Sequence, residues 1–295
     1  METPRDILKK IRQLELKTRG MIDTAFSGQY RSVFKGRGMN FEEVREYQPG
    51  DEVRAIDWNV TARTGDAYIK KFTEERELTV MLVVDVSASG EFGSVNLSKR
   101  ELAAEVACLF AFSAIRNNDK VGCILFSDHV ELMVPPAKGR AHALRIIREI
   151  LFFEPKGRGT NVACALEAMN RVLSRRSVVF LVSDFQAADF SKPMNVAARR
   201  HDMVAVTVVD PGELELPDVG RVVLEDAETG ERMVINTSDR RTRLRFAENI
   251  GGPLDEWPAY FRRYGVESIT LRTDQDYVPA LRRFFKQRTS RLLHG

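Results

Sequence analysis

The chain is 295 residues long, and its composition is that of an ordinary globular protein, with 43% hydrophobic and 29% charged residues. A chain of this length can bury a sizeable core, either as one large domain or as one domain with an appendage. Lysine and arginine number 45 against 42 aspartates and glutamates, and this formal net charge of +3 is too balanced to indicate a nucleic-acid-binding protein.

The same composition bears on where the protein works. The sequence contains no run of about 18 apolar residues, so we expect no membrane-spanning helix. Its first segment, METPRDILKKIRQLELKTRG, is charged throughout, unlike a secretory signal. Cys108, Cys123 and Cys164 show no CxxC spacing and lie in apolar stretches, which indicates buried thiols in a reducing compartment. We therefore expect a cytoplasmic protein, with peripheral association at a membrane left open.

The first 77 residues are predicted to form a helix followed by a polar subdomain. A helix over residues 4–20 can begin with Thr3 as its cap and Pro4 in its first position. Its apolar residues recur at helical spacing and therefore share one face. Residues 27–77 are polar and lack periodicity until 68–77, where alternation indicates a strand.

From residue 78 the chain alternates between apolar strands and helices. Strands are predicted at 78–85, 120–127, 130–135 (an edge strand), 177–184, 202–210 and 266–273, with a hairpin formed by 222–226 and 232–236. Helices are predicted at 96–117, 140–152, 161–174, 239–264 and 276–290, and residues 187–200 read as helix or loop. This rhythm predicts a doubly wound, mostly parallel α/β sheet over residues 78–290, with 1–77 as an N-terminal appended subdomain.

Polar residues follow two of these strands and one loop. Asp85, Ser87 and Ser89 come after the first strand, Thr160 lies in the glycine-rich GRGTNVACAL, and Asp184 ends the strand 177–184. These residues converge if the first and fourth main strands flank the point where the winding reverses. Two carboxylates and three hydroxyls form an all-oxygen set that suits Mg²⁺ or Mn²⁺.

Each of these residues also has a purely structural interpretation. Asp85 and the two serines could cap the helix near residue 96, Thr160 could cap the helix 161–174, and Asp184 could shape a turn. The sequence alone leaves both interpretations open.

The pattern D-x-S-x-S, followed by Thr and then by Asp, resembles the metal-ion-dependent adhesion site (MIDAS) of von Willebrand factor A domains over residues 78–290. The resemblance implies that Ser87 and Ser89 ligate a Mg²⁺ directly and that Thr160 joins in the ligand-bound form. Asp85 and Asp184 would act directly or through water. Gly90 stands where many of these domains have methionine.

The segment before the first strand carries a second resemblance. GRGMNFEEVREYQPGDEVRAIDWNVTAR, residues 36–63, resembles the signature of the bacterial domain-of-unknown-function 58 family. The resemblance implies a von Willebrand factor A domain and partnership with MoxR-type AAA+ ATPases in a maturation or stress role. The segment can be a partner-docking surface or a salt-bridged subdomain packed against the sheet, and its pairing residues are Arg45, Asp51, Arg54, Asp57, Trp58 and Arg63.

The leading functional hypothesis is therefore a non-enzymatic, metal-dependent protein-binding module whose Mg²⁺ takes its last ligand from a Glu or Asp of a partner. One alternative is a phosphate-transferring hydrolase with Asp85 as nucleophile, which is disfavoured because Ser87 stands where such enzymes need a second aspartate. Another is an RNA-binding von Willebrand factor A protein, which the balanced charge does not favour. Neither GxxxxGK[ST] nor GxGxxG follows a strand, so nucleotide binding is not expected.

Overall fold

The computed structural model describes residues 4–21, 34, 43–48, 56, 58–71, 77–95 and 97–294. In these parts of the chain no helix is both long and apolar enough to cross a membrane.

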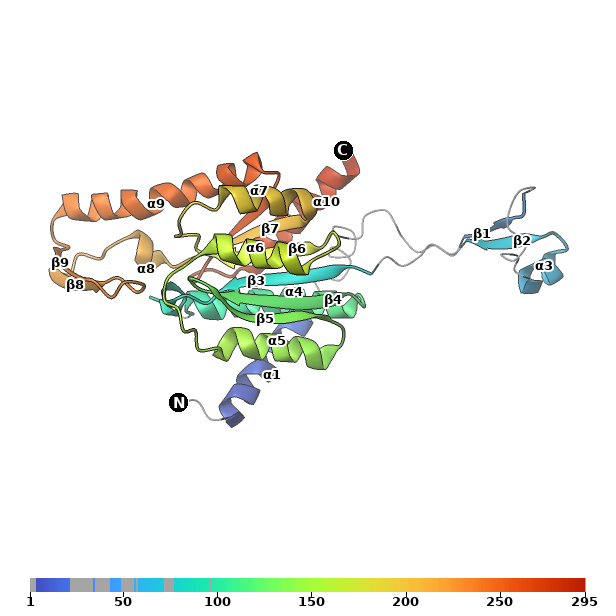
Figure 1. Ribbon diagram of the computed structural model, residues 1–295, viewed down its shortest axis with the longest axis horizontal. Helices are drawn as coiled ribbons and strands as arrows, with labels where there is room; N and C mark the ends of the chain where they lie inside the picture. Colours follow the sequence, from blue (N-terminus) through green and yellow to red (C-terminus); the bar gives the residue numbers. More distant parts are fainter. Residues whose placement is uncertain are drawn as a thin grey trace.

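A six-stranded sheet forms the centre of the molecule (Figure 1), and its strands lie in the order β10-β7-β6-β3-β4-β5. All neighbouring strands are parallel except β4 and β5, which are antiparallel. The strands are β3 (Thr79–Asp85), β4 (Lys120–Phe126), β5 (Val130–Ala137), β6 (Val178–Ser183), β7 (Asp202–Val209) and β10 (Glu267–Arg272). Numbered along the chain, this is the order 3-2-1-4-5-6 of doubly wound folds, so the predicted fold class is confirmed.

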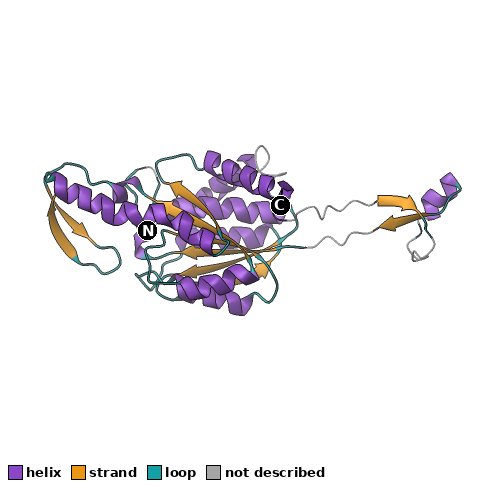
Figure 2. Cartoon of the chain, turned by 90° about the horizontal axis from the view of Figure 1, so that it is seen from above, coloured by secondary structure: helices purple, strands orange, loops and turns teal. Residues whose placement is uncertain are grey.

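The strands of this sheet are apolar on both faces because helices cover both. Along β3, Val80, Leu82 and Val84 face one core, while Met81 and Val83 face the other. The two layers of helices lie on either side of the sheet in Figure 2. The first core is covered by α4 (Lys99–Arg116), α5 (Arg140–Phe152) and α10 (Val278–His294), and the second by α6 (Val162–Val172), α7 (Ser191–Arg200) and α9 (Arg240–Arg263).

The predicted N-terminal helix is α1 (Pro4–Met21), which packs on the outside of α4 and α5. Its Ile11 and Leu14 are buried against Cys108 and Ile147. At the edge of this contact Arg140 donates two hydrogen bonds, of 2.7 and 2.8 Å, to the carboxylate of Glu15. The helix therefore extends the first core by one layer.

Two small antiparallel ribbons accompany the main sheet. In the N-terminal segment β1 (Glu43–Glu46) pairs with β2 (Tyr68–Lys71), and α3 (Trp58–Thr64) precedes β2. The strand predicted at 68–77 is thus observed as far as Lys71, and residues 72–76 lie outside the described part. The predicted hairpin is formed by β8 (Arg221–Glu225) and β9 (Arg232–Asn236), after the short helix α8 (Pro211–Leu214).

Candidate metal centre

The winding of the sheet reverses between β3 and β6, and the two predicted aspartates lie there. Asp85 is the last residue of β3, and Asp184 directly follows β6. One oxygen of Asp85, Oδ1, accepts the backbone N–H of Ser87 at 2.9 Å, and Oδ2 accepts the hydroxyl of Ser183 at 2.6 Å. Burial raises the pKa of Asp85, and the nearby charge of Asp184 raises it further. Asp184 is buried and Asp85 is partly buried, and two carboxylates close together at one sheet edge favour a cation beside them.

The two predicted serines connect these aspartates. Ser87 is buried, and Ser89 lies in the 3₁₀ turn η3 (Ala88–Glu91). Their hydroxyl oxygens are 3.1 Å apart, and Ser89 Oγ donates to Asp184 Oδ2 at 2.9 Å. The structure thus brings four of the five predicted ligands into one hydrogen-bonded chain that joins the ends of β3 and β6.

The predicted turn role of Asp184 accounts for only one of its oxygens. Oδ1 accepts the backbone N–H of Gln186 at 3.1 Å, as in an Asx turn. Oδ2 accepts from Ser89 and from the ammonium group of Lys99, at 2.7 Å. The second oxygen therefore belongs to the polar cluster at the strand ends.

Both capping alternatives are wrong. Ser98 caps α4, and it forms a reciprocal capping box with Glu101, so Asp85, Ser87 and Ser89 are not needed there. Asn161 caps α6 by accepting the backbone N–H of Cys164 at 3.1 Å. Thr160 is therefore free of a capping role.

Thr160 instead faces the hairpin. Its hydroxyl donates to Glu228 Oε1 at 2.7 Å, and Glu228 lies in the turn between β8 and β9. The Thr160 loop is tied to the serine turn because the backbone N–H of Ala88 donates to Arg158 O at 3.0 Å. Burial raises the pKa of Glu228, the Thr160 hydrogen bond opposes that rise, and the charge of Asp184 adds to it. Asp184 and Glu228 are thus electrostatic neighbours.

Sequence reasoning missed Lys99, whose ammonium is buried at the edge of the cluster. It donates to Asp184 at 2.7 Å and to Glu213 of α8 at 2.5 Å. Burial alone would lower the pKa of Lys99, but the two carboxylates hold that pKa above its ordinary value. Lys99 is the first residue of α4, where a positive charge opposes the helix dipole. A cation in that position is the sequence signal that could have identified it.

The donor chemistry of the cluster fits a hard cation. Asp85, Asp184, Ser87 and Ser89, with Thr160 in the adjoining loop, offer only oxygen, which Mg²⁺ and Mn²⁺ prefer. A small cavity of about 20 Å³ is large enough for one water-sized particle, and its lining includes Asp85, Ser89 and Asp184 as well as the basic residues Lys99 and Arg100. Within the described ranges no group of three or more His, Cys, Asp or Glu side chains is arranged to hold a metal ion. An ion at this edge would consequently depend on the hydroxyl groups as well as the carboxylates.

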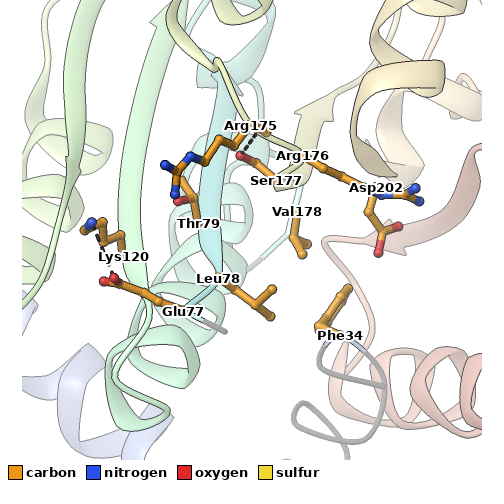
Figure 3. Close-up of a pocket in the computed structure, with 10 residues that line it drawn as sticks. All are labelled: Phe34, Glu77, Leu78, Thr79, Lys120, Arg175, Arg176, Ser177, Val178 and Asp202. Carbon is orange, nitrogen blue, oxygen red and sulfur yellow. Dashed lines mark hydrogen bonds and ion pairs between the residues drawn. The ribbon is translucent and has the colours of Figure 1, made fainter. Parts of the chain in front are cut away.

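A much larger cavity, of about 1150 Å³, lies at the opposite edge of the sheet. Figure 3 shows that its lining comes from the starts of the strands, where Lys120 forms an ion pair of 3.5 Å with Glu77. Ligands of doubly wound sheets bind at the carboxyl ends of the strands, so size alone does not make this cavity the functional site. It contains none of the predicted site residues.

Only some of the predicted partner-docking residues lie in the part of the chain that the structure describes. Trp58, at the start of α3, exposes 67% of its surface, and Arg63 in the same helix is also exposed. Arg45 lies in β1, but its side chain is outside the described part, as are Asp51, Arg54 and Asp57. The exposed indole is a suitable anchor for a partner.

Comparisons with known proteins identify relatives over almost the whole chain. Residues 43–251 match the family model described as "Protein of unknown function DUF58". "Uncharacterized protein Rv1480" of Mycobacterium tuberculosis and "Uncharacterized protein Mb1516" of Mycobacterium bovis are each 34% identical over 288 residues, covering 97% of this chain and 90% of theirs.

Two solved structures are similar at lower identity. An aerotolerance-related membrane protein from Bacteroides fragilis is 15% identical with a TM-score of 0.47, covering 72% of this chain and 99% of that one. The conserved hypothetical protein BatB from Bacteroides thetaiotaomicron is 16% identical with a TM-score of 0.46, covering 74% and 100%.

Proposed function

The chain belongs to the DUF58 family, and we propose that it is a non-enzymatic protein-binding module whose docking depends on a divalent cation. Asp85, Ser87, Ser89, Thr160 and Asp184 would hold Mg²⁺ or Mn²⁺, and a Glu or Asp of the partner would supply the last ligand. The observation that carries this proposal is the hydrogen bond of 2.9 Å between Ser89 and Asp184, which joins the two strand ends. Donors separated by 95 residues are thereby placed as one oxygen-rich group.

The environment of Asp85 favours binding over catalysis. Both of its oxygens already accept hydrogen bonds, one from the Ser87 backbone and one from the Ser183 hydroxyl. A carboxylate nucleophile needs a free oxygen aimed at its substrate and an acid nearby for the leaving group. The residue two positions on is Ser87, whose hydroxyl lies 3.1 Å from that of Ser89 and is a poor acid.

We further propose that the partner is a MoxR-type AAA+ ATPase in the cytoplasm, with the pair acting in a chaperone-like or maturation step. The support is the family signature in residues 36–63, together with an exposed Trp58 in that segment. Aromatic side chains exposed on a polar surface are frequent anchors of protein interfaces. In this arrangement the metal would hold the two proteins together by binding carboxylates of both.

The test is binding of the purified full chain to a purified MoxR-type ATPase, in Mg²⁺ and in EDTA. We expect binding in Mg²⁺ and a loss of at least about tenfold, or 1.4 kcal/mol, in EDTA or in Asp85→Ala. Ser89→Ala is a second variant, and Asp189→Ala is the matched control because Asp189 is an exposed aspartate whose carboxylate accepts from Ser191 at the start of α7. Binding that survives both EDTA and Asp85→Ala would exclude the metal bridge.

A further inference from the structure

The hairpin β8–β9 carries a carboxylate to the candidate metal centre. Figure 1 shows the hairpin at the end of the molecule where β3 and β6 finish. Its turn is shaped by Asp226, whose Oδ1 accepts the backbone N–H groups of Glu228 and Thr229 at 2.9 and 2.7 Å. Gly230 continues the turn with φ +73°, a conformation that favours glycine. This turn projects Glu228 toward Thr160.

The glycine-rich loop receives that carboxylate closely. Glu228 Oε1 accepts the Thr160 hydroxyl at 2.7 Å. A Cβ placed on Gly159 would lie 3.5 Å from Glu228 Oε2, so the other oxygen rests directly over the glycine. One carboxylate oxygen therefore bonds the loop, and the other lies close to the space beside Gly159.

We propose that Glu228 is an internal ligand of this metal centre, and that it fills the position which a partner's carboxylate takes on docking. The inference rests on the proposed function. It assigns Glu228 to the coordination sphere beside Thr160, the hydroxyl that the family resemblance links to the ligand-bound form. A partner's Glu or Asp then binds by replacing Glu228, and the hairpin moves away.

The hairpin is suited to such an exchange because several of its apolar side chains are exposed rather than packed against the main sheet. Val223, Met233 and Val234 expose between 63 and 70% of their surfaces, so neither strand is buried against the main sheet. A two-stranded ribbon of this kind is at best marginally stable by itself. Its base is held by Thr237, which bonds Gly220 O through both its backbone and its hydroxyl. The base can thus serve as a hinge while the turn leaves the site.

Charge also favours an ion between the groups. Besides burial, the charge of Asp184 raises the pKa of both Asp85 and Glu228, while Lys99 is engaged with Asp184 and Glu213. Because the described carboxylates do not form a three-carboxylate metal site by themselves, an ion here also needs the hydroxyl groups. Carboxylates in one site repel each other, and a divalent cation between them converts that repulsion into attraction.

Titration of the full chain with Mn²⁺, followed by calorimetry, tests the assignment. Glu228→Gln keeps an oxygen that can accept the Thr160 hydrogen bond but removes the charge. Because even outer-shell partners change metal affinity about 10- to 100-fold, we expect Glu228→Gln to weaken Mn²⁺ binding at least about tenfold. Glu231→Gln, an exposed carboxylate on the same hairpin, should bind Mn²⁺ like the wild type. Hydrogen exchange of residues 221–236 should slow on Mn²⁺ binding in the wild type and not in Glu228→Gln.

A second arm measures displacement. In saturating Mn²⁺, Glu228→Gln should bind the ATPase several-fold more tightly than the wild type, because no internal carboxylate competes. Equal Mn²⁺ affinity in the wild type and Glu228→Gln overturns the role of Glu228 and leaves the proposed metal site standing. Absence of Mn²⁺ binding to the wild type overturns both. Equal or weaker ATPase binding by Glu228→Gln overturns the exchange.

Discussion

Replacing Lys99 by methionine should destabilise the protein strongly in the absence of metal. The Lys99 side chain is only 3% exposed, and its partners Asp184 and Glu213 are 5% and 17% exposed. Methionine retains the apolar stem but leaves two carboxylates without their cation, and breaking a buried pair from one side costs about 3–5 kcal/mol. Burial already raises the pKa of Glu213, so this carboxyl can take up a proton. We therefore expect the free energy of unfolding to fall by an amount near the lower limit, about 3 kcal/mol at neutral pH.

The assay is urea unfolding followed by far-ultraviolet circular dichroism in EDTA, with Lys192→Met as the exposed control, expected within about 0.5 kcal/mol of the wild type. Millimolar Mg²⁺ should stabilise Lys99→Met more than the wild type, because the ion brings positive charge to Asp184. A loss below about 1 kcal/mol in EDTA would refute the buried-pair argument. Equal stabilisation of both proteins by Mg²⁺ would refute the link between Lys99 and the metal centre.

Two further predictions concern Asn161 and His201. Asn161→Ala should cost about 1 kcal/mol of stability in urea unfolding, because Asn161 caps α6. Thr160→Ala should change stability little but weaken Mn²⁺ binding measured by calorimetry. The reverse pattern would restore Thr160 as the cap. His201 is buried, and its pKa is lowered to about 4. Burial is the main cause, and the nearby charges of Arg200 and Arg176 add to it. The unfolded chain, with a histidine pKa of about 6.5, binds the proton more tightly, so stability should fall as pH drops from 6.5 toward 4, by about 2 kcal/mol at pH 5. His201→Phe should lack this component, and an unchanged difference in unfolding free energy between the two proteins at pH 7 and pH 5 would contradict it.

The position of the candidate metal centre was predictable from the sequence because it depends on topology. Uninterrupted apolar runs such as 78–85 and 177–184 indicate strands covered on both faces, and a doubly wound order makes the first and fourth of them neighbours. Asp85 and Asp184 then share an edge regardless of their separation in sequence. The capping alternative could also have been rejected, since Ser98 and Glu101 have the spacing of a capping box.

Lys99 and Glu228 were not predictable in the same way. Glu228 is 68 residues from Thr160, and Lys99 is 114 residues from Glu213. Neither pair lies in a repeating pattern, and the hairpin that carries Glu228 is an insertion between β7 and β10 rather than a strand of the main sheet. Where such an insertion folds back depends on tertiary contacts, such as those of Thr237 with Gly220 and of Arg243 with Asp218. Local residue preferences mark Lys99 as an unusual cation at a helix start, but they carry no information about its distant partners or about where the hairpin folds.

The bonding of Asp184 bears on how tightly a metal would be held. Its Oδ1 accepts from Gln186, and its Oδ2 accepts from both Ser89 and Lys99, so both oxygens have donors without an ion. A cation must compete with these donors, which lowers its affinity for the isolated chain. A partner's carboxylate would add a ligand and recover part of that cost. Coupling between two ligands is reciprocal, so whatever factor the ion adds to partner affinity, the partner must add to ion affinity. On the proposed function, metal titrations with and without the ATPase should therefore differ by the same factor as ATPase titrations with and without Mg²⁺.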